Sequence, residues 1–417
     1  MKTSAANTLF YNIGQLLTLQ RCFKKQGRLI NESDLDFISD AYLVISKGKI
    51  VWLGSKAEYK KVNLKISKKV DLGGRNVLPA FVESHTHTIF AGDRADEFEM
   101  RQQGASYQEI ASAGGGIQST MKKTRAISEK KLIKETEEKI KKFIRQGVGT
   151  LEIKTGYGLT LEEETKLLKL IYKIRKMSPI FIQPTFLGAH AVAPEYGNAV
   201  TALQKLSAGW KELAKFKPKP IIDIFIDKGF FEPEESYEYL KNGKDLGFPI
   251  AVHANQLSEG KACEVAVKLG ALSSGHLIKL SDQQISLLAK SEVTCSLLPA
   301  ADLYLKCDYP PARKLLDQGA RVALATDFNP GSSPTQDLAL VGVLARLKMK
   351  MSLPEVICAY TVGAAYALGL EKQKGHLDIS MDADFVVTSK NWKELFYCAG
   401  DMFIEDMFVS GLMVSLK

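Results

Sequence analysis

Residues 79–87 read PAFVESHTH, a short apolar run that leads into two histidines one residue apart. Such a run is typical of a strand that is buried on both faces of a parallel sheet. Because side chains alternate along an extended chain, His85 and His87 are expected to lie on the same side of the segment. Two imidazoles that share one side can bind one metal ion together.

Seven more short apolar runs follow the first one along the chain. They lie at residues 150–154, 180–186, 221–226, 250–253, 271–275, 293–298 and 322–326. Longer amphipathic stretches separate them, and Thr160 and Ser128 stand where two of the predicted helices would begin. Strands that alternate with helices pair in parallel. The count of eight predicts an α/β fold, a (βα)8 barrel of the TIM type.

Both ends of the chain instead indicate β-structure. Residues 41–55, AYLVISKGKIVWLGS, hold two apolar runs around a Lys-Gly-Lys turn and predict a hairpin. The run ADFVVT at residues 383–388 predicts a further strand. We therefore expect a division into residues 1–77, a barrel over residues 78–374, and residues 375–417.

Composition favours a cytoplasmic enzyme that acts on a small molecule. The 417 residues are 45% hydrophobic and 25% charged, as in ordinary globular proteins. The net charge of +9 comes from lysines scattered over many segments, so we expect no nucleic-acid partner. Six cysteines without a C-x-x-C pair indicate reduced thiols. No apolar run approaches the roughly 20 residues of a membrane span, and the N-terminus does not resemble a signal peptide.

Ligand-type side chains gather at the predicted strand ends, where barrel enzymes place their catalytic groups. They are His85 and His87 after the first strand, His190 after the third, His253 at the fifth, His276 at the sixth and Asp327 after the eighth. Each has an ordinary alternative explanation, such as a hydrogen-bonded core histidine or an aspartate that begins a turn. Their convergence predicts a site in which His85, His87, His253 and Asp327 bind zinc or iron, with a position left for water.

The order of these residues resembles that of the amidohydrolase superfamily. Longer stretches are similar to its imidazolonepropionase family, which hydrolyses the cyclic amide of an imidazolone that carries a propionate. These are SHTHTIFAGDRADEFEMRQQGASYQEIASAGGGIQST, EIKTGYGL, PTFLGAHAVAPEY, VHANQLSEG, SLLPAADLYL and ALATDFNPGSSP, spread over about residues 78–335. The resemblance implies one divalent or trivalent metal ion per chain, a homodimer, and a small β-sandwich domain built from both chain ends.

The same resemblance implies roles for substrate-binding residues. Arg94 would pair with the propionate carboxylate, since a guanidinium offers two parallel hydrogen bonds. Tyr157, and less strongly Tyr107, would contact polar atoms of the substrate. His190 would hydrogen-bond the imidazolone carbonyl oxygen and stabilise charge that develops there. Further contacts would come from Gln256, Asn329, Gly331 and Ser332.

In the implied reaction Asp327 is the general base and later the proton donor to the leaving nitrogen. His276 would orient the attacking water or polarise the carbonyl group. Gln256 stands where some family members carry glutamate, and an amide can only hydrogen-bond.

Three other interpretations stay open. Lys228, after the fourth strand, keeps a second metal ion possible, because two-metal relatives use a carboxylated lysine near this position. A deaminase of heterocycles would share the metal ligands but would not need Arg94. A non-catalytic relative that serves as an assembly scaffold would be expected to lack a ligand, yet all four are present.

Overall fold

The computed structural model describes residues 7–104 and 115–416, and Tyr107 lies outside them. Eight strands form one sheet in the order β13-β12-β11-β10-β9-β8-β7-β6, and all neighbours pair in parallel. The strands are β6 (Phe81–Glu83), β7 (Val148–Lys154), β8 (Phe181–Ala189), β9 (Ile221–Ile226), β10 (Ala251–Ala254), β11 (Ser273–His276), β12 (Thr294–Leu297) and β13 (Val322–Leu324). Each overlaps one of the eight predicted runs, so the barrel prediction is confirmed.

The first and last strands meet just beyond their carboxyl ends. Thr86 and Phe328 form a parallel bridge, and the Phe328 carbonyl accepts a hydrogen bond of 2.9 Å from the backbone N–H of His87. The N–H of Asp327 donates to the His85 carbonyl over 3.1 Å. The barrel is thus closed by the segments that carry three of the predicted metal ligands.

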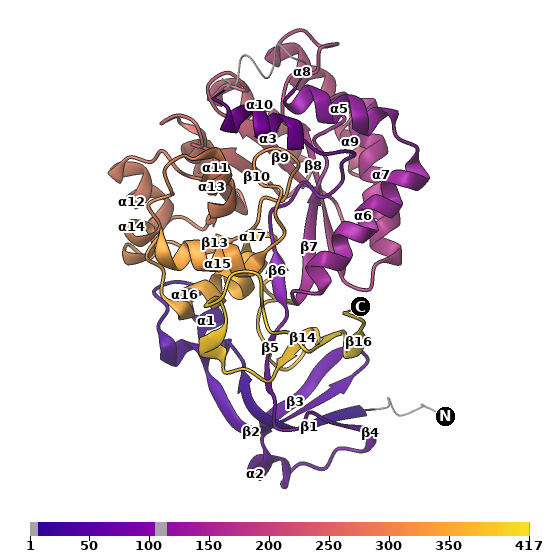
Figure 1. Ribbon diagram of the computed structural model, residues 1–417, viewed down its shortest axis with the longest axis vertical. Coiled ribbons are helices and arrows are strands. Elements are labelled where there is room, and N and C mark those ends of the chain that lie inside the picture. The colour runs from indigo at the N-terminus through magenta and orange to yellow at the C-terminus, as the bar shows by residue number, and fades with distance from the viewer. Residues whose placement is uncertain (1–6, 105–114, 417) are drawn as a thin grey trace.

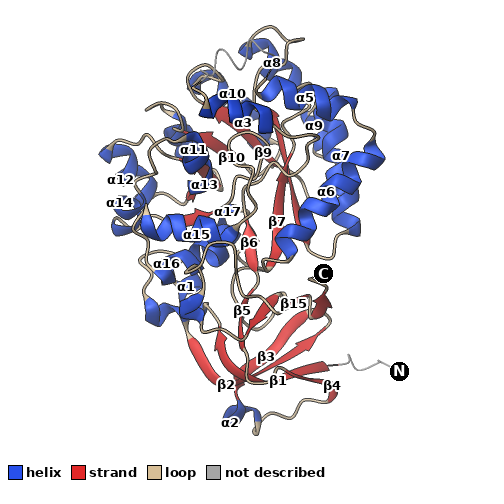
Figure 2. Cartoon of the chain, viewed as in Figure 1, coloured by secondary structure: helices blue, strands red, loops and turns tan. Residues whose placement is uncertain are grey.

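Helices surround the barrel on its outside (Figure 2). The predicted caps are present: the Thr160 hydroxyl accepts from the N–H of Glu163, and Ser128 caps the preceding helix through the N–H of Lys131. The helices are α3 (Ala95–Gln102), α5 (Ile117–Ala126), α6 (Glu129–Ile144), α7 (Leu161–Met177), α8 (Ala199–Ser207), α9 (Trp210–Leu213), α10 (Pro233–Asp245), α11 (Ala262–Leu269), α12 (Asp282–Lys290), α13 (Pro299–Leu305), α14 (Ala312–Asp317), α15 (Leu338–Leu347), α16 (Leu353–Cys358) and α17 (Ala364–Ala367).

A second sheet, drawn from both chain ends, lies below the barrel in Figure 1. Its strands are β1 (Asn7–Leu17), β2 (Phe37–Ser46), β3 (Lys49–Ser55), β4 (Ile66–Asp71), β5 (Asn76–Pro79), β14 (Phe385–Thr388), β15 (Asp406–Val409) and β16 (Leu412–Val414), with the short helices α1 (Gln20–Lys24) and α2 (Lys56–Tyr59) beside them. The predicted hairpin is β2–β3, and its turn residues Lys47 and Gly48 both have positive φ. Phe10 packs against Phe385 and Phe408, so the core joins the two chain ends.

The chain passes from the small sheet into the barrel at a single residue. Val77 and Leu78 of β5 pair with β14, whereas Phe81 of β6 pairs with β7. Ala80 between them donates to the Asp384 carbonyl. The first barrel strand, and with it the His-x-His pair, is therefore anchored directly on the small sheet. The limits at residues 77 and 374 stay predictions.

Candidate metal centre and substrate cavity

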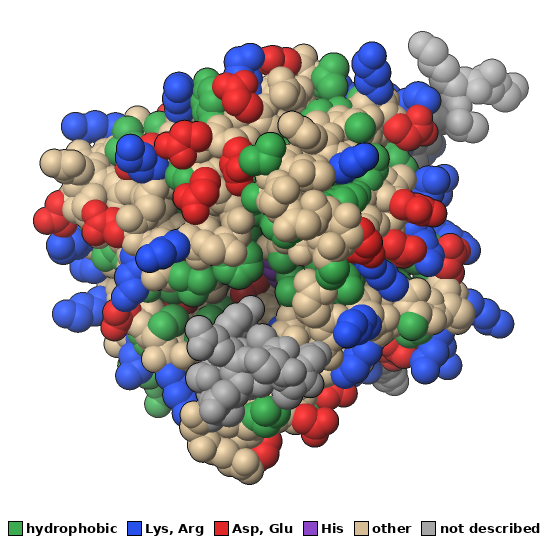
Figure 3. Space-filling model, turned by 90° about the horizontal axis from the view of Figure 1, so that it is seen from above, with side chains coloured by type: hydrophobic (Ala, Val, Ile, Leu, Met, Phe, Trp, Pro, Cys, Tyr) green, Lys and Arg blue, Asp and Glu red, His purple; other side chains and the backbone are tan. Residues whose placement is uncertain are grey.

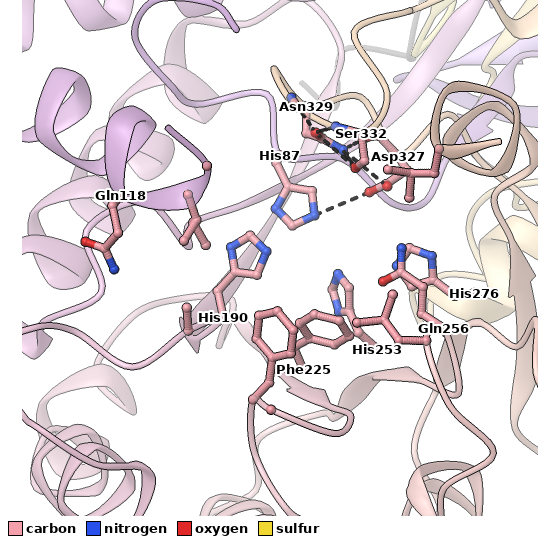
Figure 4. A pocket seen from close by; sticks show the side chains of 18 of the residues that line it. His87, Gln118, His190, Phe225, His253, Gln256, His276, Asp327, Asn329 and Ser332 are labelled. Atoms are coloured by element: carbon pink, nitrogen blue, oxygen red, sulfur yellow. Dashed lines mark hydrogen bonds and ion pairs between the residues drawn. The ribbon is translucent and has the colours of Figure 1, made fainter. Parts of the chain in front are cut away.

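The carboxyl ends of five barrel strands bring six ligand-type side chains to one end of the barrel. His85 and His87 follow β6, His190 follows β8, His253 lies on β10, His276 ends β11, and Asp327 follows β13. Figure 4 shows the imidazoles of His87, His190, His253 and His276 grouped around one space with Asp327 at its edge. The four predicted ligands are each at most 4% exposed.

Two overlapping groups of these side chains hold their ligand atoms close enough together to bind a metal ion. His85, His87 and His253 form one group whose ligand atoms all lie within 4.8 Å of one another, and His85, His276 and Asp327 form another. Asp327 Oδ1 is 3.5 Å from His85 Nε2 and 3.4 Å from His87 Nε2. All four predicted ligands thus come together, and His276, which was not predicted as a ligand, lies in the second of these groups.

Several polar atoms in this group suit a cation. Asp327 Oδ1 is buried without a hydrogen-bond partner among the described residues. Nε2 of His85 and Nε2 of His253 face each other at 3.0 Å, and burial lowers the pKa of His85 well below its usual value. Two neutral imidazoles that direct lone pairs at one point repel each other unless a cation or a shared proton lies between them. Three imidazoles and a carboxylate are a donor set that fits zinc or iron.

The backbone at the strand ends adopts a conformation that side chains rarely take. Asn255, His276 and Asp327 have φ values of 51°, 70° and 53°, in the left-handed region. Such residues cost on the order of 1–3 kcal/mol each and gather at functional sites. Three strand ends therefore share this left-handed geometry at the centre.

Sequence reasoning missed a buried network behind the ligands. Asp223 on β9 accepts a hydrogen bond from His253 Nδ1 over 3.1 Å and contacts Lys154 Nζ at 2.7 Å. Lys154, on β7, also contacts Glu152 at 2.8 Å, and all three charged side chains are at most 1% exposed. Burial raises the pKa of Asp223, but His253 and Lys154 outweigh it, so that pKa is lowered. The network fixes which His253 nitrogen faces the centre.

A signal for this network was present in the sequence. The runs TLEIK at residues 150–154 and IIDIFI at residues 221–226 each place charged residues inside a strand that is otherwise apolar. Side chains alternate along a strand, so Glu152, Lys154 and Asp223 can point inward while their neighbours face the helices. A charge inside a barrel persists only when another charge pairs with it. The pairing itself depends on strand order, which no single run reveals.

A cavity of about 810 Å³ opens beside the metal centre. Its lining includes His87, His190, His276 and Asp327 together with residues of α3, α5 and the loop after β13. Figure 3 looks onto this end of the barrel, where a hollow near the middle shows histidine inside it. Its size suits a small molecule that must reach the metal centre.

Arg94 lies at the cavity wall, one residue before α3. Its Nε donates to the Thr120 hydroxyl over 2.8 Å, which leaves the rest of the guanidinium for other partners. A Cβ atom at Gly331 would lie 2.3 Å from Arg94 Nη1, so only glycine permits this approach. Arg101 donates to the Gly331 carbonyl over 3.0 Å. Two positive side chains therefore bracket Gly331 at the side of the cavity.

The loop after β13 is organised by Asn329. Its Oδ1 accepts from the N–H groups of Gly331 and Ser332, both over 2.8 Å, and its Nδ2 donates to the Ser332 hydroxyl. Nδ2 also contacts Asp327 Oδ2 at 3.2 Å. The Asn329 turn thus joins the carboxylate of the metal centre to the part of the cavity next to Arg94.

Two further predicted residues, Tyr157 and His190, come from neighbouring loops. Tyr157 is 2% exposed, with its ring 6.0 Å from that of His87. The ring of His190 stacks on that of His87 at 4.9 Å. His190 Nδ1 lies 2.9 Å from the Gly156 carbonyl oxygen. Both rings face the cavity beside a metal ligand.

Gln256 and Lys228 follow the strands β10 and β9. Both line the cavity, and Lys228 is exposed. Asp227 accepts hydrogen bonds from the N–H groups of Gln256 and Leu257, which fixes the loop after β10. The predicted site residues other than Tyr107 therefore all lie around one metal centre and its cavity.

A family model described as the amidohydrolase family matches residues 76–414. An imidazolonepropionase of Bdellovibrio bacteriovorus is 52% identical over 97% of this chain and 96% of its own length. One from Bacillus velezensis is 38% identical over 91% of this chain and 90% of its own.

Solved structures with low identity share the fold. A triazine hydrolase from Arthrobacter aurescens superposes with a TM-score of 0.74 at 15% identity, covering 98% of this chain and 94% of that one. The guanine deaminase of E. coli gives 0.71 at 16% identity, with 99% of each chain covered. At these identities the likeness concerns the fold alone.

Proposed function

The chain belongs to the amidohydrolases and, within them, to the imidazolonepropionase family, and from this premise we propose how its residues open an imidazolone ring. The substrate is 4-imidazolone-5-propanoate, and the product is N-formimidoyl-L-glutamate, in histidine degradation. The observation that carries this proposal is that Arg94 lines the same cavity as His87, His253 and Asp327, whose side chains lie beside His85.

One of the four proposed ligands, Asp327, also serves as the general base. When bound, the metal ion acts as a Lewis acid and lowers the pKa of water toward about 7. Asp327 takes the proton of the attacking water and later delivers it to the ring nitrogen that leaves. Burial raises the pKa of the Asp327 carboxyl in the absence of a cation. The neutral ring of His276, whose pKa burial lowers to about 3, orients the water.

Substrate orientation follows from the two ends of the cavity. At one end the guanidinium of Arg94, whose Nε donates to Thr120, binds the propionate, since a planar fork matches a carboxylate. At the other end the ring lies against Tyr157, His190 and Gln256, so the amide carbon faces the metal centre. The Asn329 turn, with Gly331 and Ser332, holds the tail between them. Tyr107 stays a proposed contact from outside the described residues.

Activity against several substrates tests the reaction. We expect the purified, metal-loaded enzyme to deplete the absorbance of imidazolonepropionate, and to leave guanine and cytosine unchanged. An imidazolone without the propionate serves as the matched control for Arg94 and should be a much poorer substrate. Turnover of guanine or cytosine without turnover of imidazolonepropionate would instead establish a heterocycle deaminase.

We also propose zinc or iron as the metal, one ion per chain, because three imidazoles and one carboxylate accept both. A cytoplasmic location is supported by six free cysteines, which persist in a reducing compartment. No helix in the described part of the chain has the length and apolar character to cross a bilayer. A homodimer is proposed from the family, and light scattering on the purified protein measures it.

A further inference from the structure

A buried carboxylate outside the metal centre holds the loop that carries Tyr157. Glu164, in the first turn of α7, is 0% exposed. Its Oε2 accepts from the N–H of Gly156 over 2.8 Å, and its Oε1 accepts from Gly158 and Leu159, both over 2.6 Å. One side chain thus satisfies three backbone donors of a single loop, residues 156–159.

The conformation of this loop depends on such support. Gly156 has a φ of 119° and Leu159 a φ of 62°, both in the left-handed region. A Cβ atom at Gly158 would lie 2.6 Å from the backbone nitrogen of Glu164, so the loop packs directly on the start of α7. Strained backbone persists when its surroundings fix it. Glu164 does so from the first turn of α7, through its three hydrogen bonds to the loop.

The loop in turn fixes the ring of His190. A Cβ atom at Gly156 would lie 2.9 Å from His190 Nδ1, and the Gly156 carbonyl oxygen lies at the same distance from that nitrogen. A carbonyl oxygen can only accept, so Nδ1 carries the hydrogen. In a neutral imidazole the other nitrogen, Nε2, is then an acceptor. Nε2 has no hydrogen-bond partner within residues 7–104 and 115–416, and His190 lines the cavity.

We propose that Glu164 is a positioning residue which, through the Gly156 carbonyl, presents His190 Nε2 as an acceptor to an N–H group of the substrate ring. This inference rests on the proposed function and alters one expectation from the sequence, in which His190 meets the carbonyl oxygen. An imidazolone ring contains an amide N–H beside its carbonyl group, so it offers the donor that this geometry requires.

Kinetics of Glu164→Gln test the positioning role. A glutamine side chain keeps only one of the two acceptor oxygens of Glu164. Its NH2 group would face backbone N–H groups of the loop, which are donors themselves. We expect kcat/KM for imidazolonepropionate to fall about tenfold or more, because small displacements of catalytic groups are costly. Since Glu164 acts in part through His190, the loss in Glu164→Gln combined with His190→Ala should be clearly smaller than the product of the two single losses. Losses that multiply would overturn the proposal, as would a folded Glu164→Gln enzyme with wild-type kinetics.

Glu355→Gln is the matched control. Glu355 is also a buried glutamate in the first turn of a helix, but it pairs with Arg313 and caps α16 at Ser352. Its replacement should lower the melting temperature and leave kcat/KM within about twofold of wild type. An equal kinetic loss in both variants would mean that Glu164 only stabilises the fold, which contradicts the proposal.

A second measurement reads the tautomer of His190 directly in the wild-type enzyme. Nitrogen-15 NMR of histidine-labelled, zinc-loaded enzyme reports the tautomer of each imidazole, and the chain has six histidines. We expect His190, assigned from the spectrum of His190→Ala, to carry hydrogen on Nδ1 alone. Hydrogen on Nε2 would overturn the proposal. Because this readout needs no turnover, wild-type enzyme that fails to hydrolyse imidazolonepropionate refutes the proposed function separately.

Discussion

Asp327 is proposed both to bind the metal ion and to act as the general base. Its Oδ1 lies between His85 and His87, and its other oxygen contacts Asn329. We predict that Asp327→Asn lowers kcat by about 10³-fold, because general-base catalysis is lost, while substrate affinity is largely kept. Steady-state kinetics together with metal analysis of the same sample measure this. Wild-type turnover in the variant would exclude Asp327 as the base.

Arg94 is predicted to act on binding rather than on chemistry. Arg94→Ala removes charge-assisted hydrogen bonds worth about 1.5–3 kcal/mol, so KM for imidazolonepropionate should rise roughly 10- to 100-fold. Arg94→Lys keeps the charge but not the fork, and should give an intermediate KM. An effect on kcat alone would mean that this residue does not anchor the propionate.

At the level of elements, the barrel strands hold a charged interior network. Asp223 on β9 orients His253 on β10, and Lys154 on β7 holds Asp223. We predict that Asp223→Asn weakens metal binding by about 10- to 100-fold. Competition with a chromophoric chelator measures the affinity, and Asp317→Asn in an exposed ion pair is the control. Unchanged affinity in Asp223→Asn would show that the hydrogen bond to His253 is dispensable.

The strands were predictable because burial on both faces leaves an apolar run in the sequence, as at residues 221–226. The convergence of the candidate ligands was predictable because they follow these runs directly, as His85 and His87 do. The pairing of Asp223 with Lys154 was not, since it depends on neighbours in space from β7 and β9. Glu164 reads as an ordinary residue in the first turn of a helix, and only the folded loop reveals its three donors.

For the whole molecule, we predict that a bound metal ion couples the first and last strands of the barrel. His85 and His87 leave β6, which continues from the small sheet, and Asp327 leaves β13. We predict that metal at 100 times its dissociation constant stabilises the fold by about 2.7 kcal/mol. Calorimetry of apo and loaded protein measures the melting temperature. The double variant His85→Ala with His253→Ala should show no metal-dependent rise, and an undiminished rise would place the ion elsewhere.

The central claim is that one ion, held by His85, His87, His253 and Asp327, enables ring opening. Titration of metal-free enzyme with zinc, while hydrolysis of imidazolonepropionate and bound metal are followed in the same sample, tests it most directly. We expect activity to rise from zero in proportion to bound metal and to reach its plateau at one equivalent per chain. Full activity without metal, or activity that requires two equivalents, would contradict it.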